Sequence, residues 1–161
     1  MKNLKLALLS TAVFALIGLS LGHSNIVSSN PKDHAHLMTA PKNIMLEFDE
    51  AIESKVSTFK VYFYKPEAMM KGSKAMSGAQ MDDFAEAAAK KFMALKTDTA
   101  DRMDTGLINT KAQATKVTIG LKANLKPGVY VIAWKTTSVD THVETGFIHF
   151  HLEGHSMPGM K

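Results

Sequence analysis

The sequence predicts an all-β domain, a Greek-key β-barrel or Ig-like β-sandwich, with one helix inserted into it. Several short segments alternate apolar and polar residues and are separated by turn residues, as in sandwiches and barrels. A single alanine- and lysine-rich segment breaks this alternation with helical spacing. Subtracting a 22-residue leader from the 161 residues leaves 139, which suits one domain.

The first 22 residues have the features of a signal peptide. Lys2 and Lys5 form a short basic start, residues 6–19 are apolar and uncharged, and Gly22 is small, as expected before a cleavage point. A membrane anchor is the alternative, but the apolar run is shorter than the ~20 residues that a span needs. We expect cleavage before His23, export to the periplasm, and a mature domain of residues 23–161.

Five segments are predicted to be strands. Residues 43–49 follow Pro41 and place Ile44, Leu46 and Phe48 on one face. Residues 57–65 alternate in the same way. The other three are residues 116–121, residues 129–136 after the turn Lys126-Pro127-Gly128, and residues 146–152. We expect Tyr130, Trp134 and Phe150 in the core, with Ile148, Phe150 and Leu152 facing inward.

Residues 82–96 predict the inserted helix, which we place at about residues 80–96. Its apolar residues recur at helical spacing, namely Phe84, Ala88, Phe92 and Leu95. Glu86 and Lys90 form an i,i+4 pair of opposite charge. Residues 97–110 are expected to be a loop that returns the chain to the sheet.

The composition directs attention to histidine and methionine. The chain has no cysteine, 7 histidines and 11 methionines, so any affinity for a soft metal must come from imidazole or thioether groups. The leader holds two lysines, which leaves 17 basic and 15 acidic residues in the mature part. This balance argues against a nucleic-acid partner.

Cleavage before His23 would create a chelating residue, because its free amine and its ring Nδ1 can hold one ion together. Asp140-Thr141-His142 offers two further ligands; if this segment is extended, both outer side chains point to one face, ~6.6 Å apart. An amine, two imidazoles and a carboxylate suit tetragonal copper(II) better than tetrahedral zinc. The alternatives are a solvated turn after the strand and a disordered first residue.

Several motifs together resemble one family, the CopC copper-resistance family of periplasmic copper carriers. The resemblance fails between about residues 67 and 110. The matching segments are His23, Ser28-Ser29-Asn30-Pro31, Pro41, Leu46-Glu47-Phe48-Asp49-Glu50, Leu125-Lys126-Pro127-Gly128-Val129-Tyr130, Trp134, Ser138-Val139-Asp140-Thr141-His142 and residues 146–150.

The resemblance implies a small Greek-key barrel that binds one copper(II) ion through His23, Asp140 and His142. It also places the carboxylate of Glu50 beside the ion without a direct bond. The expected function is to sequester or deliver copper in copper homeostasis and resistance, as a monomer and not as an enzyme. The expected partner is a membrane copper transporter of the CopD type.

The methionines are a second candidate site, for copper(I). Met69, Met70, Met76 and Met81 occur where many members of this family hold copper(I), in a stretch that also contains glycine. Thioethers are soft ligands and favour that ion. The alternative is that Met69 and Met81 fill gaps under the inserted helix.

Histidines near the C-terminus are weaker auxiliary candidates. Alternation places His149 and His151 on the outward face of the last strand, with His155 nearby. The alternative is that they are exposed histidines of an edge strand without a function. His34 and His36 have the same two-residue spacing and the same two interpretations.

Two other functions stay open from the residues alone. Copper held by an N-terminal histidine also occurs in polysaccharide monooxygenases, although these usually have a disulfide and a flat aromatic face. This chain has no cysteine and few aromatic residues. The second alternative is an Ig-like interaction domain that binds no metal.

Overall fold

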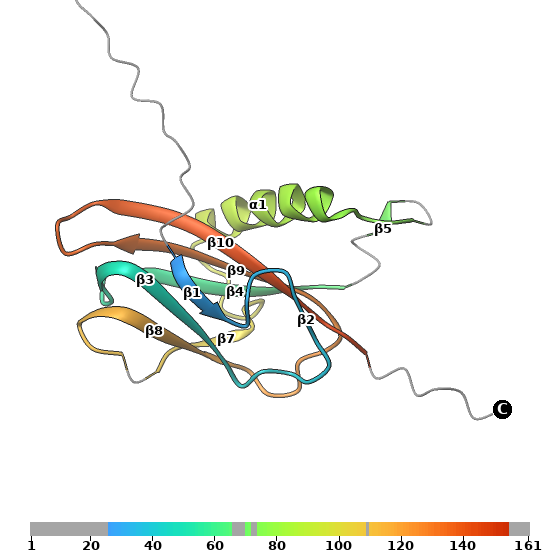
Figure 1. Cartoon of the computed structure of the whole chain (residues 1–161), viewed down its shortest axis with the longest axis horizontal. Helices are drawn as coiled ribbons and strands as arrows, with labels where there is room; N and C mark the ends of the chain where they lie inside the picture. The colour runs from blue at the N-terminus through green and yellow to red at the C-terminus, as the bar shows by residue number, and fades with distance from the viewer. Residues whose placement is uncertain (1–25, 66–69, 72–73, 109, 155–161) are drawn as a thin grey trace, which may run out of the picture.

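Two four-stranded sheets pack face to face, and one helix covers the outer face of the second sheet (Figure 1). The computed structural model describes residues 26–65, 70–71, 74–108 and 110–154. The sandwich and the inserted helix confirm the predicted fold class.

The first sheet has the order β1-β3-β8-β7 and is antiparallel throughout. Its strands are β1 (Ile26–Asn30), β3 (Asn43–Glu53), β8 (Gln113–Leu121) and β7 (Asp104–Leu107). The segment at residues 97–110 was predicted to be a loop, and this is wrong for β7. Met103 N–H donates to the Val61 carbonyl at 2.7 Å, and Asp104 accepts from Val61 N–H at 2.9 Å. These bonds from another strand hold β7 in place where its own sequence gives no alternation.

The second sheet has the order β2-β10-β9-β4. Its strands are β2 (Ala35–Leu37), β10 (Val143–Leu152), β9 (Gly128–Thr137) and β4 (Thr58–Tyr64). β2 runs parallel to β10, and the other pairs are antiparallel. β10 therefore lies inside the sheet, and its description as an edge strand is wrong. Two very short strands, β5 (Met70–Lys71) and β6 (Lys74–Ala75), pair with each other before the helix.

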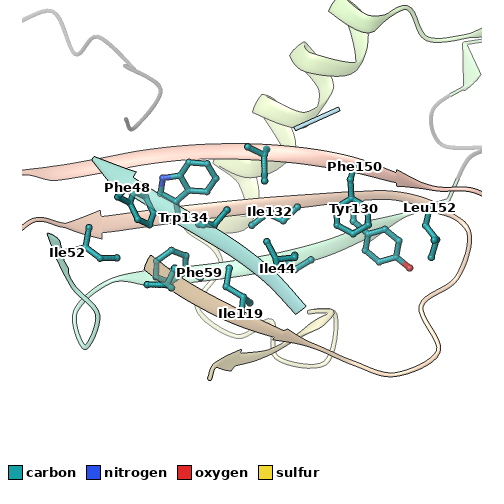
Figure 2. Close-up of a cluster of buried hydrophobic side chains, with 14 residues drawn as sticks. Ile44, Phe48, Ile52, Phe59, Ile119, Tyr130, Ile132, Trp134, Phe150 and Leu152 are labelled. Carbon is teal, nitrogen blue, oxygen red and sulfur yellow. The ribbon is translucent and has the colours of Figure 1, made fainter. Parts of the chain in front are cut away.

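The main core fills the space between the two sheets, as Figure 2 shows. Tyr130, Trp134 and Phe150 are buried in it, as predicted, and so are Ile148 and Leu152. The Tyr130 and Phe150 rings stack at 5.1 Å, and Phe48 meets the Trp134 ring edge-on. Alternation along β3 and β8 supplies the facing layer, so the periodicity of the sequence explains this core.

A second cluster lies on the other face of β9, under the helix α1 (Gly78–Ala94). Val129, Val131 and Ala133 pack here against Met81 and Ala85. β9 is thus covered on both faces, which explains its nearly uninterrupted apolar sequence.

Both ends of α1 are fixed. Ser77 is its N-cap and forms a capping box with Gln80, which gives α1 a defined start shortly before the predicted one. At the other end, the Lys60 ammonium donates to the carbonyls of Phe92 and Leu95 at 2.9 and 2.6 Å. A cation at the C-terminus of a helix satisfies carbonyls that lack partners within the helix.

Candidate metal centre

Asp140 and His142 lie in the tight turn that joins β9 to β10. Ser138 N–H donates to the His142 carbonyl and Thr141 N–H to the Ser138 carbonyl, both at 2.9 Å. Thr141 has a φ of 76°, a left-handed conformation that is unusual for a β-branched residue. The segment is therefore not extended, because these bonds fold it into a turn.

The turn brings the two candidate ligands closer than an extended strand would. Asp140 Oδ2 lies 2.7 Å from His142 Nδ1, while the Ser138 hydroxyl donates to the other carboxylate oxygen. Two donors in neighbouring positions around one ion lie about 2.9 Å apart, because each bond is ~2 Å long. Both side chains are open to solvent, at 56% exposure for Asp140 and 77% for His142. An ion from solvent can therefore reach both groups, and its binding would replace the direct contact between them.

Negative charge gathers around this turn. The hydrogen bond from Ser138 lowers the pKa of Asp140 and keeps it ionised. Val139 N–H donates to the Ala51 carbonyl at 3.1 Å, which holds the far part of β3 beside the turn. Burial, and then the charges of Glu50 and Asp49, raise the pKa of Glu144. A cluster of carboxylates attracts a cation, and this is consistent with the predicted place of Glu50 beside the site.

His23 lies outside the described residues. The described chain begins at Ile26, which pairs with Phe48 of β3, two residues before Glu50. β1 runs antiparallel to β3, so its start faces the part of β3 that contacts the turn. Three residues of chain can span up to ~10 Å. The role of His23 as a ligand stays a prediction.

Of the four methionines, the structure describes the side chains of Met76 and Met81, and both belong to the apolar cluster between α1 and β9. Met81 is buried under α1 against β9, and Met76 packs at the margin of the same cluster. Met69 lies outside the described residues, and the structure describes Met70 by its backbone in β5. Met81 thus fills space under the helix, as the alternative predicted, and the copper(I) role of the group stays a prediction.

The histidines of β10 differ from their predicted surroundings. His149 does face away from the main core, but α1 and the chain before β2 cover it, and it is only 2% exposed. Its description as an exposed histidine is wrong. Its ring Nε2 lies 3.2 Å from Asp82 of the helix, a residue that the sequence did not single out. Spacing alone cannot reveal this pair, because it depends on where α1 docks.

His151 is partly buried beside His36 of β2. The two rings stack at 4.6 Å, and His36 Nδ1 lies 2.6 Å from Glu153. Burial, followed by the neighbouring histidines, lowers the pKa of His151. His155 lies outside the described residues. The auxiliary role of these residues as metal ligands stays a prediction.

A cavity of about 400 Å³ lies elsewhere, between β1 and β10. The cavity is lined by residues of β1 and by Lys32, Asp33, Trp134 and Ile148. No residue of the turn lines it. It is therefore separate from the Asp140–His142 turn. In the part of the chain that the structure describes, no helix is long and apolar enough to cross a membrane.

Comparison with known proteins gives a consistent result. The family model of the CopC domain matches residues 26–83 and 82–153. The chain is 26% identical over 134 residues to the copper transport protein CutJ of Bacillus subtilis (strain 168). These residues make up 83% of this chain. The match covers 18% of that relative, so the chain spans about a fifth of its length.

Two solved structures share the fold. The first is CopC from Methylosinus trichosporium OB3b, with a TM-score of 0.54 and 16% identity, covering 86% of this chain and all of that one. The second is PcoC, a methionine-rich copper resistance protein from Escherichia coli, with a TM-score of 0.52 and 22% identity, covering 81% of this chain and 99% of that one.

Proposed function

Because the chain belongs to the CopC domain family, we propose that it is a periplasmic protein that binds copper(II) and sequesters or delivers it in copper homeostasis and resistance. The observation that carries this proposal is the turn between β9 and β10. It holds a carboxylate and an imidazole 2.7 Å apart in solvent, at the end of the domain where β3 supplies further carboxylates.

The proposed ligands are the amine and ring of His23, with Asp140 and His142. Signal-peptide cleavage before His23 supplies the amine, and the direction of β1 relative to β3 supports its approach to the turn. A set rich in nitrogen donors suits copper(II). Glu50 stays beside the ion and contributes charge without a direct bond.

The exposed position of the turn suits a carrier. An ion held at a protruding turn can pass to an acceptor by exchange of ligands, one at a time. We propose a membrane copper transporter of the CopD type as the acceptor, in line with the copper transport protein that this chain resembles. The protein acts as a monomeric carrier in this proposal, and oxidative cleavage of chitin or cellulose by the copper-loaded protein would contradict that part of it.

The test compares copper(II) affinity among variants of the protein that begins at His23. A chelator competition should give a dissociation constant that rises about tenfold or more in His142→Ala, because even residues that only orient a metal ligand contribute 10–100-fold. His36→Ala is the matched control. His36 pairs with His151, nine residues along β10 from His142 and ~30 Å away at the rise of a strand.

The pH dependence of the same affinity provides a second measurement. Copper(II) must displace protons from the amine and from both imidazoles, because these groups bind a metal only in their unprotonated forms. Affinity should therefore fall steeply between pH 8 and pH 5. Equal affinity in His142→Ala and the unmodified protein, or a flat pH profile, would contradict the proposal.

A further inference from the structure

We propose that Asp33, His34 and His149 form a second metal site, which binds a divalent transition-metal ion such as zinc(II) through one carboxylate oxygen and two ring Nδ1 nitrogens. Asp33 and His34 lie in the chain between β1 and β2, and His149 lies in β10. The site uses none of the residues proposed for copper(II).

Backbone hydrogen bonds hold these three residues together. The His34 N–H donates to the His149 carbonyl at 2.8 Å, and Asp33 Oδ1 accepts from the His149 and His34 N–H groups at 2.9 and 3.0 Å. Each residue offers one ligand atom, and these atoms lie within 4.8 Å of one another. Ligand atoms bound tetrahedrally to zinc(II) lie ~3.4 Å apart, because each bond is ~2 Å long. Binding would therefore need only a small approach of the side chains.

Asp82 of α1 determines which ring nitrogens are available to the ion. Its Oδ1 lies 2.6 Å from His34 Nε2 and 3.2 Å from His149 Nε2. Since a carboxylate only accepts, a neutral ring that bonds to it carries its proton on Nε2 and its lone pair on Nδ1. A carboxylate behind one nitrogen is the usual way in which an imidazole that binds metal through the other is oriented. Asp82 thus positions both rings and is not a ligand.

The Nδ1 atom of His149 is the observation that points to a ligand. The His149 side chain is 2% exposed, and its Nδ1 has no hydrogen-bond partner among the described residues. Nδ1 is also the ring nitrogen closer to the backbone, where Asp33 binds the His149 N–H. Buried polar groups are normally satisfied, and one that is not calls for an explanation such as an ion. A metal ion at Nδ1 would satisfy this buried lone pair.

The contact between Asp33 and His34 also calls for a cation. Asp33 Oδ2 lies 3.6 Å from His34 Nδ1. With the ring proton on Nε2, both atoms are acceptors, and they repel each other unless a cation lies between them. A proton on His34 Nδ1 would remove this repulsion but would leave His149 Nδ1 unsatisfied. A single metal ion bound to all three atoms resolves both problems.

The site is open to solvent on one side. The side chains of Asp33 and His34 are 43% and 54% exposed, whereas His149 forms the closed inner wall. The open side leaves room for water as a fourth ligand, as in zinc sites with three protein ligands. An ion bound here would join the chain before β2 to β10. Because it binds only the folded protein, it would stabilise the domain.

The experiment titrates zinc(II) alone into the residue 23–161 protein carrying His142→Ala, which removes the proposed copper ligand at the turn. Ring ¹⁵N NMR distinguishes the two nitrogens of each histidine. We expect zinc(II) to shift the Nδ1 signals of His34 and His149 while both Nε2 atoms stay protonated. The affinity is read from the His149 Nδ1 signal.

This affinity should fall about tenfold or more in Asp33→Asn and in His34→Asn. Asparagine at position 33 keeps an acceptor oxygen for the two backbone N–H groups but replaces the ligand oxygen with an NH₂ group. Asparagine at position 34 tolerates the left-handed φ of 60°. Both variants should therefore fold. Zinc(II) should raise the melting temperature of the His142→Ala protein but not that of the same protein with Asp33→Asn.

Asp83→Asn is the matched control, because it makes the same chemical change at an exposed position beside Asp82. It should leave the zinc(II) affinity unchanged. An unshifted His149 Nδ1 signal at saturating zinc(II), or zinc(II) bound at Nε2 instead, would overturn the proposal. So would an affinity that Asp33→Asn and His34→Asn leave unchanged. These outcomes do not affect the copper(II) proposal, since that is tested at His142.

Discussion

Lys60→Met should detach the end of the inserted helix and destabilise the whole domain. The Lys60 ammonium is buried and makes three bonds, to the Phe92 and Leu95 carbonyls and to Asp98 at 2.6 Å. Asp98 is equally buried, and the Tyr62 hydroxyl also donates to it. Burial opposes ionisation of Asp98, but the bonds from Lys60 and Tyr62 outweigh it and lower its pKa.

The magnitude follows from the carboxylate that the substitution leaves behind. Methionine replaces the alkyl stem of Lys60 but not its charge, so Asp98 stays buried with a single donor. Removing one partner of a buried ion pair costs ~3–5 kcal/mol, a large share of the ~5–15 kcal/mol that stabilises a domain. With a urea slope of about 2 kcal/mol per M, the midpoint should fall by ~1.5–2.5 M.

Urea unfolding measured by far-UV circular dichroism and by the fluorescence of the single tryptophan, Trp134, gives the assay. Lys60→Met/Asp98→Asn should recover part of the loss, because the uncompensated charge is gone. Lys90→Met, on the helix whose end Lys60 binds, is the matched control: the pair of Lys90 with Glu86 is exposed and worth only ~0.3–0.5 kcal/mol. The reasoning would be refuted if Lys60→Met lowered the free energy of unfolding by less than about 1 kcal/mol. It would also be refuted if the double variant lost as much stability as Lys60→Met and Asp98→Asn lose separately, added together.

Three further outcomes are expected. Gly146→Ala places a Cβ 2.5 Å from the buried Trp134 ring, and overpacking of this kind should lower the free energy of unfolding by ~1–3 kcal/mol; an unchanged urea midpoint would contradict it. The pKa values of all three tyrosines are raised, that of Tyr130 to about 12 by burial. Absorbance at 295 nm should therefore show little tyrosine ionisation at about pH 10 in the folded protein. The free energy of unfolding should fall as pH rises from about 10 toward 12, because the tyrosines of the unfolded chain ionise first. Full tyrosine ionisation near pH 10 without unfolding would refute this. Ser138→Ala removes the donor to Asp140, so the Asp140 pKa should rise toward its ordinary value in a metal-free NMR titration, and an unmoved value would show that Ser138 does not set it.

Four of the five strands that the sequence predicted place one face in the main core, and the fifth, β9, is covered on both faces. β3, β4, β8 and β10 alternate because one side packs into the core, and period two reports this directly. The sequence analysis missed β1, β2 and β7 because each has only three to five residues, and pairing with other strands holds them in place. Such pairing leaves no periodic signal in the strand itself.

The errors at the candidate sites have one physical origin, which is packing between distant segments. Alternation correctly separates His149 from the inward face of Phe150, but only the docking of α1 decides that His149 is buried beside Asp82. The residue types at Asp140 and His142 point to a metal site. The turn between them depends on a left-handed Thr141, and threonine gives no turn signal of that kind.

The most direct test of the copper(II) site is an electron paramagnetic resonance spectrum of the copper-loaded protein that begins at His23, compared with the same protein carrying one extra residue before it. Our account predicts a type-2 copper(II) signal with nitrogen couplings that is lost or strongly altered by the extension, because the free amine is then displaced from His23. Identical spectra from the two proteins would contradict ligation by the amine and ring of His23 together with Asp140 and His142.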